Sequence, residues 1–364
     1  MKITRRDFNR QALTTMGATL AAASLPSFGM GAPLVLSKMG IASTSFSGAQ
    51  IGSGGPRTPA GQQAPPRQFA QRDAMQFLEK CHALGAGGIQ TSLNGDLPKL
   101  RARADELGMY IEGMVSIPRN GDMSSLEKQL TDMKSIGVKV ARAAMLSGRR
   151  YESFSTLADW KKWVDGSYEA IRLAMPVIEK HKVVVALENH KDWTLEDFQK
   201  LLKTYQSEYL QVCLDFGNNI SLLDDPMEVI TGLAAYAKST HIKDMAVQPY
   251  EQGFLLSEVN LGTGMLDLAK IVQIIQKANP QAKFSLEMIT RDPLKVPCVT
   301  DQFWEVFPDR NGKYLARTFK LVNEKMWHKP LPTVSELSPE ARTKVEEDNV
   351  KACIQYVNEK QLIA

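Results

Sequence analysis

The stretch VVVALENH at residues 183–190 is a short run of apolar, mostly β-branched residues that ends in a carboxylate, Glu188. LQVCLDFG at 210–217 and FSLEMIT at 284–290 have the same form, and KSTHIKD at 238–244 places a histidine where the other three have an acid. Short apolar runs are typical of strands that are buried in a parallel sheet. These four segments therefore predict neighbouring strands of an α/β fold.

Four similar runs lie closer to the N-terminus and complete the set of predicted strands: 35–43, 86–93, 109–117 and 139–145. Helical patterns separate them, including a long amphipathic stretch over 156–180 and a capped start at Thr194, with Asp197 three residues on. Eight alternations of strand and helix predict a (β/α)8 barrel, the TIM-barrel fold. The alternative, a doubly wound sheet, would show a glycine-rich phosphate loop after its first strand. Residues 47–68 contain glycine without that arrangement, so we expect a loop over the barrel mouth or a surface insertion.

The chain is expected to have three parts. Residues 1–32 have the basic start, mildly apolar middle and small residues of an export signal, and TRRDF at 4–8 resembles the twin-arginine (Tat) consensus. We therefore expect export by the Tat pathway and a mature protein in the periplasm or outside the cell. Residues 33–295 form the predicted barrel, and residues 296–364 form a C-terminal helical extension packed on it.

The C-terminal extension contains large aromatic residues that would bury the most apolar area. Its last helix is predicted to begin at the cap residue Ser338 and to run to about Gln361. Charged residues fall on most of its turns, which favours a solvated surface helix. The expected packing anchors are Phe303, Trp304, Phe307 and Trp327.

Composition excludes several classes of function. The chain of 364 residues carries a formal net charge of +4, and +3 of it lies within residues 1–32, so the remainder is near +1. This balance gives no electrostatic basis for binding nucleic acid. No apolar run reaches the roughly 20 residues that span a bilayer, so no membrane insertion is expected. The four cysteines have no CxxC spacing, which argues against a zinc ribbon or a disulfide scaffold.

The four strand-end residues Glu188, Asp215, His241 and Glu287 are the candidate metal ligands. A buried carboxylate needs a partner, and adjacent barrel strands lie only about 4.8 Å apart, so neighbouring strand ends can converge on one point. Three carboxylates and one imidazole make a mixed oxygen and nitrogen site, which suits Mn²⁺, Mg²⁺, Co²⁺ or Zn²⁺.

Further polar residues lie beside these four. Residues two apart on a strand face the same side, so His190 shares the face of Glu188 and Lys243 that of His241. Two others are charged residues within apolar runs, which would either reach the pocket or form structural ion pairs. The candidates for substrate contact are His190, Asn218, Lys243, Arg142 and Glu112.

The motifs LENH (187–190), LDFGN (214–218), HIKD (241–244) and SLEM (285–288) occur in the order and on the strands that resemble the sugar phosphate isomerase/epimerase family of xylose isomerase-like TIM barrels. LGTGMLDL at 261–268 is similar to that family's glycine-containing segment before the following helix. The resemblance covers the eight predicted strands. It is specific for the fold and the metal site but not for the substrate.

The resemblance implies that one divalent metal ion, expected to be Mn²⁺ with Co²⁺, Mg²⁺ or Zn²⁺ as alternatives, is held by all four candidate ligands. It also implies that Glu188 and Glu287 are the catalytic acid/base pair. One of them would remove the proton beside a ketose carbonyl and give an enediolate. Proton return from the opposite face gives an epimer, and return to the other carbon gives an aldose. Asn218 departs from the ketose 3-epimerase pattern, which often has histidine there, and this leaves proton handling and substrate choice open.

The resulting hypothesis is a metal-dependent isomerase or epimerase of a non-phosphorylated keto-sugar, because phosphorylated sugars are scarce outside the cytoplasm. The alternative is a lyase that eliminates the C1 substituent of a 3-keto-glycoside. A non-catalytic sugar-binding protein is a third possibility, against which the intact Glu188 and Glu287 argue. A type-two AP endonuclease would need a histidine-rich multi-zinc cluster, and the chain has five histidines in all. The expected partner is a sugar or glycoside, and a homo-oligomeric state stays open.

Overall fold

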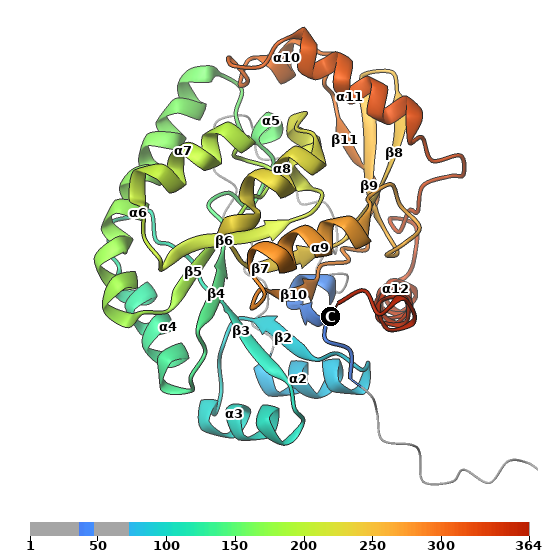
Figure 1. Ribbon diagram of the computed structural model, residues 1–364. Coiled ribbons are helices and arrows are strands. Elements are labelled where there is room, and N and C mark those ends of the chain that lie inside the picture. The colour runs from blue at the N-terminus through green and yellow to red at the C-terminus, as the bar shows by residue number, and fades with distance from the viewer. Residues whose placement is uncertain (1–35, 47–72, 364) are drawn as a thin grey trace, which may run out of the picture. The chain divides into compact units, whose positions relative to one another are not determined.

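Eight parallel strands close into a barrel in the computed structural model, which describes residues 36–46 and 73–363 (Figure 1). They are β1 (Gly40–Ala42), β2 (Gly88–Thr91), β3 (Tyr110–Met114), β4 (Val140–Ala143), β5 (Val184–Glu188), β6 (Leu210–Asp215), β7 (Ala237–Ile242) and β10 (Lys283–Leu286). Ile41 pairs with Ile89 of β2 on one side and with Leu286 of β10 on the other, so the sheet is closed. Each predicted run overlaps one of these strands, and the (β/α)8 fold is confirmed.

Seven helices follow the first seven barrel strands on the outside of the barrel: α2 (Ala74–Ala83), α3 (Leu97–Glu106), α4 (Ser124–Ser135), α6 (Leu157–His181), α7 (Leu195–Tyr205), α8 (Pro226–Leu233) and α9 (Leu268–Ala278). Six of the seven, all but α4, begin after a side-chain cap that satisfies otherwise unpaired backbone N–H groups. Thr194 and Asp197 form a capping box at α7, as the sequence predicts. Four other helices begin after an aspartate cap: Asp73, Asp96, Asp225 and Asp267.

The last helix, α12 (Pro339–Lys360), begins after the cap residue Ser338 as expected and lies between α9 and α2, where the ring of outer helices would otherwise be open. Lys80 of α2 and Glu347 of α12 form an ion pair of 2.7 Å. The expectation of a solvated helix is only half right, because apolar residues spaced by three and four form a buried face. That face consists of Val350, Cys353, Ile354 and Val357.

A second sheet stands outside the barrel and was not predicted. Strands β8 (Asp244–Tyr250), β9 (Gly253–Val259) and β11 (Leu294–Val296) pair antiparallel in the order β11-β9-β8, beside α11 (Gly312–Glu324) (Figure 1). Lys243 is the single residue between β7 and β8. The predicted strand 238–244 therefore runs across a strand boundary, because no glycine or proline marks it in the sequence.

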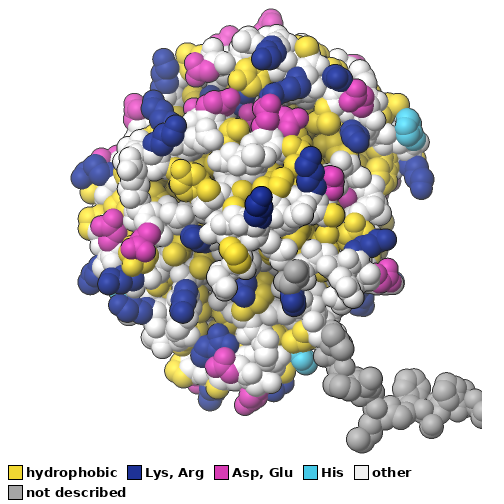
Figure 2. Space-filling model, viewed as in Figure 1, with side chains coloured by type: hydrophobic (Ala, Val, Ile, Leu, Met, Phe, Trp, Pro, Cys, Tyr) yellow, Lys and Arg dark blue, Asp and Glu magenta, His cyan; other side chains and the backbone are white. Residues whose placement is uncertain are grey.

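The surface and the C-terminal residues agree with a globular α/β protein. Basic and acidic side chains are interspersed on the face in Figure 2. Phe303 and Phe307 are buried and stacked with ring centroids 4.6 Å apart, while Trp304 and Trp327 are partly buried. Within the described ranges, no helix is both long and apolar enough to cross a membrane. The predicted export signal at 1–32 and the predicted loop at 47–68 lie outside the described residues.

Candidate metal centre

The ends of four adjacent barrel strands bring the candidate ligands together. Glu188, Asp215 and His241 belong to β5, β6 and β7, and Glu287 directly follows β10. One ligand atom of each lies within 4.8 Å of one ligand atom of every other, and each of the four residues is at most 3% exposed. Parallel strands hold their carboxyl ends at one rim of a barrel, which is why residues 99 positions apart in the chain meet here.

His241 Nδ1 lies at the middle of this group. It is 3.5 Å from Glu188 Oε1, 3.7 Å from Asp215 Oδ2 and 3.4 Å from Glu287 Oε1. The nitrogen is buried and has no hydrogen-bond partner among the described residues. A nitrogen lone pair and three carboxylate oxygens at these distances need a cation or a proton among them. The donor set therefore fits one divalent metal ion.

The other atom of each candidate ligand is held by a second group. The Arg142 Nε–H donates to Glu188 Oε2 at 2.5 Å, and Lys243 Nζ donates to Glu287 Oε2. Asp215 Oδ1 accepts the backbone N–H groups of Gly217 and Asn218 at 2.9 and 2.8 Å. His241 Nε2 lies 2.6 Å from Gln90 Oε1, which orients the ring with Nδ1 toward the carboxylates. Such outer contacts fix the direction of ligand atoms in metal sites.

The charges around the centre shift its pKa values in opposite directions. Burial alone would raise the pKa of Glu188, but the Arg142 guanidinium and His241 hold it well below its usual range. Burial also opposes ionisation of Glu287, and His241 with Lys243 lowers the pKa of that carboxyl in spite of it. For Asp215 burial prevails and raises the pKa, although Lys243 Nζ lies 2.7 Å from Oδ2. Both glutamates are thus carboxylates at neutral pH.

Four of the five residues expected to contact substrate border this centre. Arg142 and Lys243 pair with its carboxylates, and Asn218 Nδ2 donates to Glu188 Oε1 at 2.9 Å. His190 is partly exposed just beyond Glu188. Burial, and then the neighbouring Lys191, lowers the pKa of His190 to about 3, so the ring is neutral.

The fifth, Glu112, lies one layer deeper in the barrel. Its Oε2 accepts hydrogen bonds from Gln90 Nε2 at 3.1 Å, Ser239 Oγ at 2.8 Å and Ser285 Oγ at 3.2 Å. Ser239 precedes His241 by two residues on β7, so this polar layer lies directly beneath the histidine. Glu112 therefore reaches the centre through Gln90, and burial raises the pKa of its carboxyl.

Three residues beside the centre were not singled out in the sequence. Gln90 contacts His241, and Thr44 Oγ1 donates a hydrogen bond of 3.0 Å to Glu287 Oε1. Lys191 Nζ donates to Asn218 Oδ1. The sequence of a short strand does not show that a neutral polar residue such as Gln90 or Thr44 contacts a metal ligand. For Lys191 the signal was its place in the loop that follows β5, three residues after Glu188.

The HIKD and LGTGMLDL motifs meet in space, although the sequence suggests only that both belong to one pattern. Both Asp244 oxygens accept backbone N–H groups: those of Gly262 (3.0 Å) and Gly264 (2.8 Å) reach Oδ2, and those of Met245 (2.8 Å) and Leu266 (3.1 Å) reach Oδ1. A Cβ on Gly264 would lie 2.2 Å from Asp244 Oδ1, so the turn requires glycine there. We call this arrangement the Asp244 turn.

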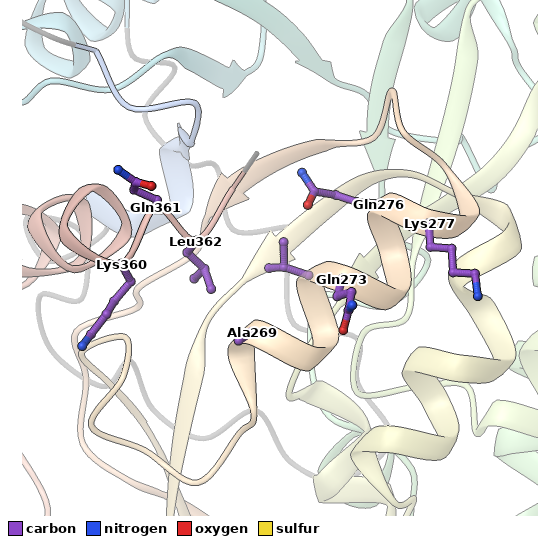
Figure 3. Close-up of a pocket in the computed structure, with 8 residues that line it drawn as sticks. Ala269, Gln273, Gln276, Lys277, Lys360, Gln361 and Leu362 are labelled. Carbon is purple, nitrogen blue, oxygen red and sulfur yellow. The ribbon is translucent and has the colours of Figure 1, made fainter.

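Two cavities lie away from the four ligands. One of about 540 Å³ lies between α9 and the end of α12, lined by Gln273, Lys277, Lys360 and others (Figure 3). The second, of about 630 Å³, is lined by Glu258 of β9, by Arg291 and by the segment from Met326 to Leu337. The ion pair of Arg291 with Glu258 forms part of its wall. Met288, which follows the candidate ligand Glu287 in the chain, also lines the second cavity.

Comparisons with known proteins agree with this architecture. Residues 78–302 match the family described as xylose isomerase-like TIM barrel, and the chain belongs to that family. A 3-oxo-isoapionate decarboxylase from Pectobacterium atrosepticum is 30% identical over 210 residues, which cover 55% of this chain and 72% of that protein.

Two solved structures are more distant. A xylose isomerase-like TIM barrel protein from Mycobacterium smegmatis in complex with magnesium is 17% identical, with a TM-score of 0.46, and covers 77% of this chain and 97% of its own. The 3-keto-D-glucoside 4-epimerase of E. coli is 14% identical, with a TM-score of 0.47, and covers 78% and 99%. These likenesses concern the fold.

Proposed function

We propose that this chain is a divalent-metal-dependent sugar isomerase or epimerase that acts on a non-phosphorylated keto-sugar through an enediolate. The observation that carries the proposal is the unpartnered His241 Nδ1, surrounded by three carboxylate oxygens at 3.4–3.7 Å. A divalent ion bound there supplies Lewis-acid polarisation of the substrate carbonyl. Mn²⁺ is the proposed ion, with Co²⁺, Mg²⁺ and Zn²⁺ as alternatives for a site of this composition.

Glu188 and Glu287 are placed to act as the acid/base pair. Their strands, β5 and β10, lie at the two ends of the arc β5-β6-β7-β10, so the two carboxylates approach a common point from opposite sides. Arg142 and Lys243 hold the outer oxygen of each and favour its ionised form, which is the form of a general base. One glutamate removes the proton beside the carbonyl and becomes protonated. In isomerisation this glutamate returns its proton to the adjacent carbon. In epimerisation the other glutamate takes up a proton from solvent and donates it to the opposite face, and the first glutamate loses its proton to solvent.

The remaining polar groups would hold the catalytic carboxylates in position or bind the substrate. Asn218 Nδ2 contacts Glu188 Oε1, and Thr44 Oγ1 contacts Glu287 Oε1, so each catalytic carboxylate has a neutral donor beside its inner oxygen. Those donors hold the carboxylates in place while the proton is transferred. The neutral, partly exposed His190 is available to accept or donate a hydrogen bond to a sugar hydroxyl.

Decarboxylation is a second candidate, favoured by the relative whose name is 3-oxo-isoapionate decarboxylase. A 3-oxo acid loses CO2 when the electrons of the breaking C–C bond move onto the polarised carbonyl, which leaves an enolate to be protonated. The same centre serves both reactions, because each develops negative charge on the carbonyl oxygen. Elimination of the C1 substituent from a 3-keto-glycoside would begin with the same proton removal and stays a third possibility.

Metal analysis and isotope exchange test the proposal together. We expect about one equivalent of divalent metal in the purified protein, and deuterium incorporation from D2O into a keto-sugar beside its carbonyl. Glu287→Gln should fold normally and lose at least about 10³-fold of the exchange rate, since the amide cannot accept the proton. The matched control is Glu208→Gln, an exposed glutamate, which should behave as the wild type.

The products distinguish the candidate reactions. Exchange with retention of all carbons supports isomerisation or epimerisation, CO2 release from a 3-oxo acid supports decarboxylation, and release of an aglycone supports elimination. Unchanged exchange in Glu287→Gln would contradict the acid/base assignment. Absence of metal after reconstitution with Mn²⁺, Co²⁺ and Zn²⁺ would contradict the metal centre.

Export by the Tat pathway is a separate proposal that rests on the pair Arg5 and Arg6 within residues 1–32. Cell fractionation of the full chain, with and without the Arg5→Lys/Arg6→Lys double substitution, tests it. We expect the unaltered chain outside the cytoplasm and the double variant retained inside. An unchanged distribution would contradict this route.

A further inference from the structure

Lys191 is a buried cation at the edge of the candidate metal centre. It lies three residues after Glu188 and is 2% exposed. Its Nζ donates to the amide oxygen Asn218 Oδ1. Among the residues that the structure describes, no carboxylate forms an ion pair with it. An ammonium group that is removed from water without a counter-charge is costly, so such a group points to an anion that is supplied from elsewhere.

The other cations that border the centre are all paired, and of these Lys243 is buried while Arg142 and Arg291 are partly buried. Arg142 pairs with Glu188, Lys243 with Asp215 and Glu287, and Arg291 with Glu258. Lys191 differs from these three in having only an amide as its partner. Burial, and then the like charges of Arg291 and Lys243, lower the pKa of Lys191 to about 8, although Glu258 and Asp215 act in the opposite direction. The ammonium form still predominates at neutral pH.

Asn218 places Lys191 within reach of a substrate. The amide oxygen accepts from Lys191, and the amide nitrogen of the same side chain donates to Glu188 Oε1 at 2.9 Å. One side-chain amide thus separates the ammonium group from a candidate metal ligand. His190, next in the chain, is partly exposed, and its Nδ1 has no hydrogen-bond partner in the described part of the molecule. The loop after β5 therefore places a buried ring nitrogen without a partner next to the ammonium group of Lys191.

We propose that Lys191 receives the carboxylate of the substrate, and that the substrates of this site are keto-sugar acids. The inference rests on the proposed function and names its substrate class. A carboxylate carries one negative charge, which matches the single positive charge of Lys191, and it leaves the four existing ion pairs intact. A phosphate dianion would need a second free cation, and the neighbouring Arg291 and Lys243 are already bound to carboxylates.

Calorimetric titration of the Mn²⁺-loaded protein with matched ligands tests this directly. The ligand pairs are 2-keto-D-gluconate with D-fructose and 5-keto-D-gluconate with L-sorbose, whose members differ only in a carboxylate or a hydroxymethyl group. We expect at least one acid to bind about 10- to 100-fold more tightly than its neutral partner, as a charge-assisted hydrogen bond allows. Lys191→Met should abolish that preference and change the affinity for the neutral sugar by less than about twofold.

Two further variants separate a binding role from a structural one. Lys191→Arg keeps the charge and should keep part of the preference for the acid. Lys203→Met removes an exposed lysine and should bind every ligand as the wild type does. Mn²⁺ content and melting temperature are measured for each variant. D-Fructose 6-phosphate is included as the phosphate probe.

The inference is overturned if the wild type shows no preference for either acid, if Lys191→Met keeps the preference, or if the phosphate probe is the ligand that depends on Lys191. These results are independent of turnover. A Lys191-dependent preference without isotope exchange supports the substrate class and contradicts the proposed reaction. Isotope exchange on neutral ketoses without that preference supports the reaction and contradicts the role of Lys191.

Discussion

The candidate metal centre and the Asp244 turn both depend on buried carboxylates, and the four residues HIKD contribute to both. In the Asp244 turn, four backbone N–H groups satisfy the two oxygens of one acid. In the metal centre, by contrast, backbone N–H groups reach only Asp215 Oδ1, while Oδ2 lies 2.7 Å from Lys243 Nζ and 3.7 Å from the unpartnered His241 Nδ1. Burial of an acid therefore does not by itself indicate a metal. The informative feature is the ligand atom that the protein leaves unsatisfied.

Asp215→Asn is expected to have the largest effect on metal content and activity. If it had no effect, the distinction between the candidate metal centre and the Asp244 turn would fail. The substitution removes the charge of one ligand but keeps the acceptor for the backbone N–H groups. We expect metal content to fall from about one equivalent to near zero and kcat/KM to fall by at least about 10³-fold, with the fold retained.

The matched control for this prediction is Asp267→Asn. Asp267 caps α9 through its side chain, and asparagine caps a helix equally well. The control should therefore keep both metal and activity. Full metal content in Asp215→Asn, measured by plasma mass spectrometry, would show that the aspartate is structural in the way that Asp244 is.

Asp244→Ala tests the other member of the comparison and should affect stability instead of metal content. The change leaves four backbone N–H groups without their acceptor, and at roughly 1 kcal/mol for each bond the free energy of unfolding should fall by about 4 kcal/mol. Urea unfolding of the metal-free protein measures this effect. Gly264→Ala should reproduce much of it, because the new Cβ would collide with Asp244 Oδ1.

Metal content is the second readout for the Asp244 turn. Both variants should still bind about one equivalent of metal at temperatures where they are folded. Loss of metal with unchanged unfolding free energy would reverse the distinction, since it would make the Asp244 turn a part of the centre.

The Glu258–Arg291 pair is intermediate between the two regions, because here a buried acid is satisfied by a cation of the protein itself. Burial opposes its ionisation, yet Arg291, Lys243 and Lys191 lower the pKa of Glu258 to about 2. An acid whose pKa is lower in the folded than in the unfolded state stabilises the fold above its unfolded pKa, here near 4.5, and this contribution is lost as the pH falls toward 2.

The size of that contribution follows from the shift and is about 3 kcal/mol. We expect unfolding free energies, measured in urea between pH 5 and pH 2.5, to fall less steeply in Glu258→Gln than in the wild type. Glu208→Gln, at an exposed position, is the control and should follow the wild type. Equal slopes in all three proteins would exclude Glu258 as a source of acid sensitivity.

Gln90→Ala should have the smallest effect and sharpens the description of the centre. The substitution removes the 2.6 Å contact to His241 Nε2 without touching any candidate ligand atom. We expect metal affinity to fall by about tenfold, since contacts of this kind orient the ring. Gln273→Ala on α9 is the control. An unchanged affinity, measured by competition with a metal indicator, would mean that the packing around His241 suffices to orient it.

The sequence predicted the barrel well because its signal is local. Most barrel strands are short apolar runs, and each predicted run overlaps one strand. The second sheet was missed because Lys243 alone separates β7 from β8, and no turn residue interrupts the pattern. The buried face of α12 was obscured by the charges on its other face, although Val350, Ile354 and Val357 have helical spacing.

The sequence by itself determined which residues end the strands. Alternation and strand order place Glu188, Asp215, His241 and Glu287 at one rim, because parallel strands of a closed barrel share a direction. Their chemistry as oxygen and nitrogen ligands follows from residue type alone.

Only the tertiary structure decided which atoms of these residues are free and which are held. The partners Gln90, Thr44 and Asn218 come from distant strands and loops, and no local pattern relates them to the ligands. The structure likewise separates Lys191, which no carboxylate of the described chain neutralises, from the paired Lys243 and Arg142. Hydrogen bonds and ion pairs depend on distances between segments that are far apart in the chain, and folding alone fixes those distances.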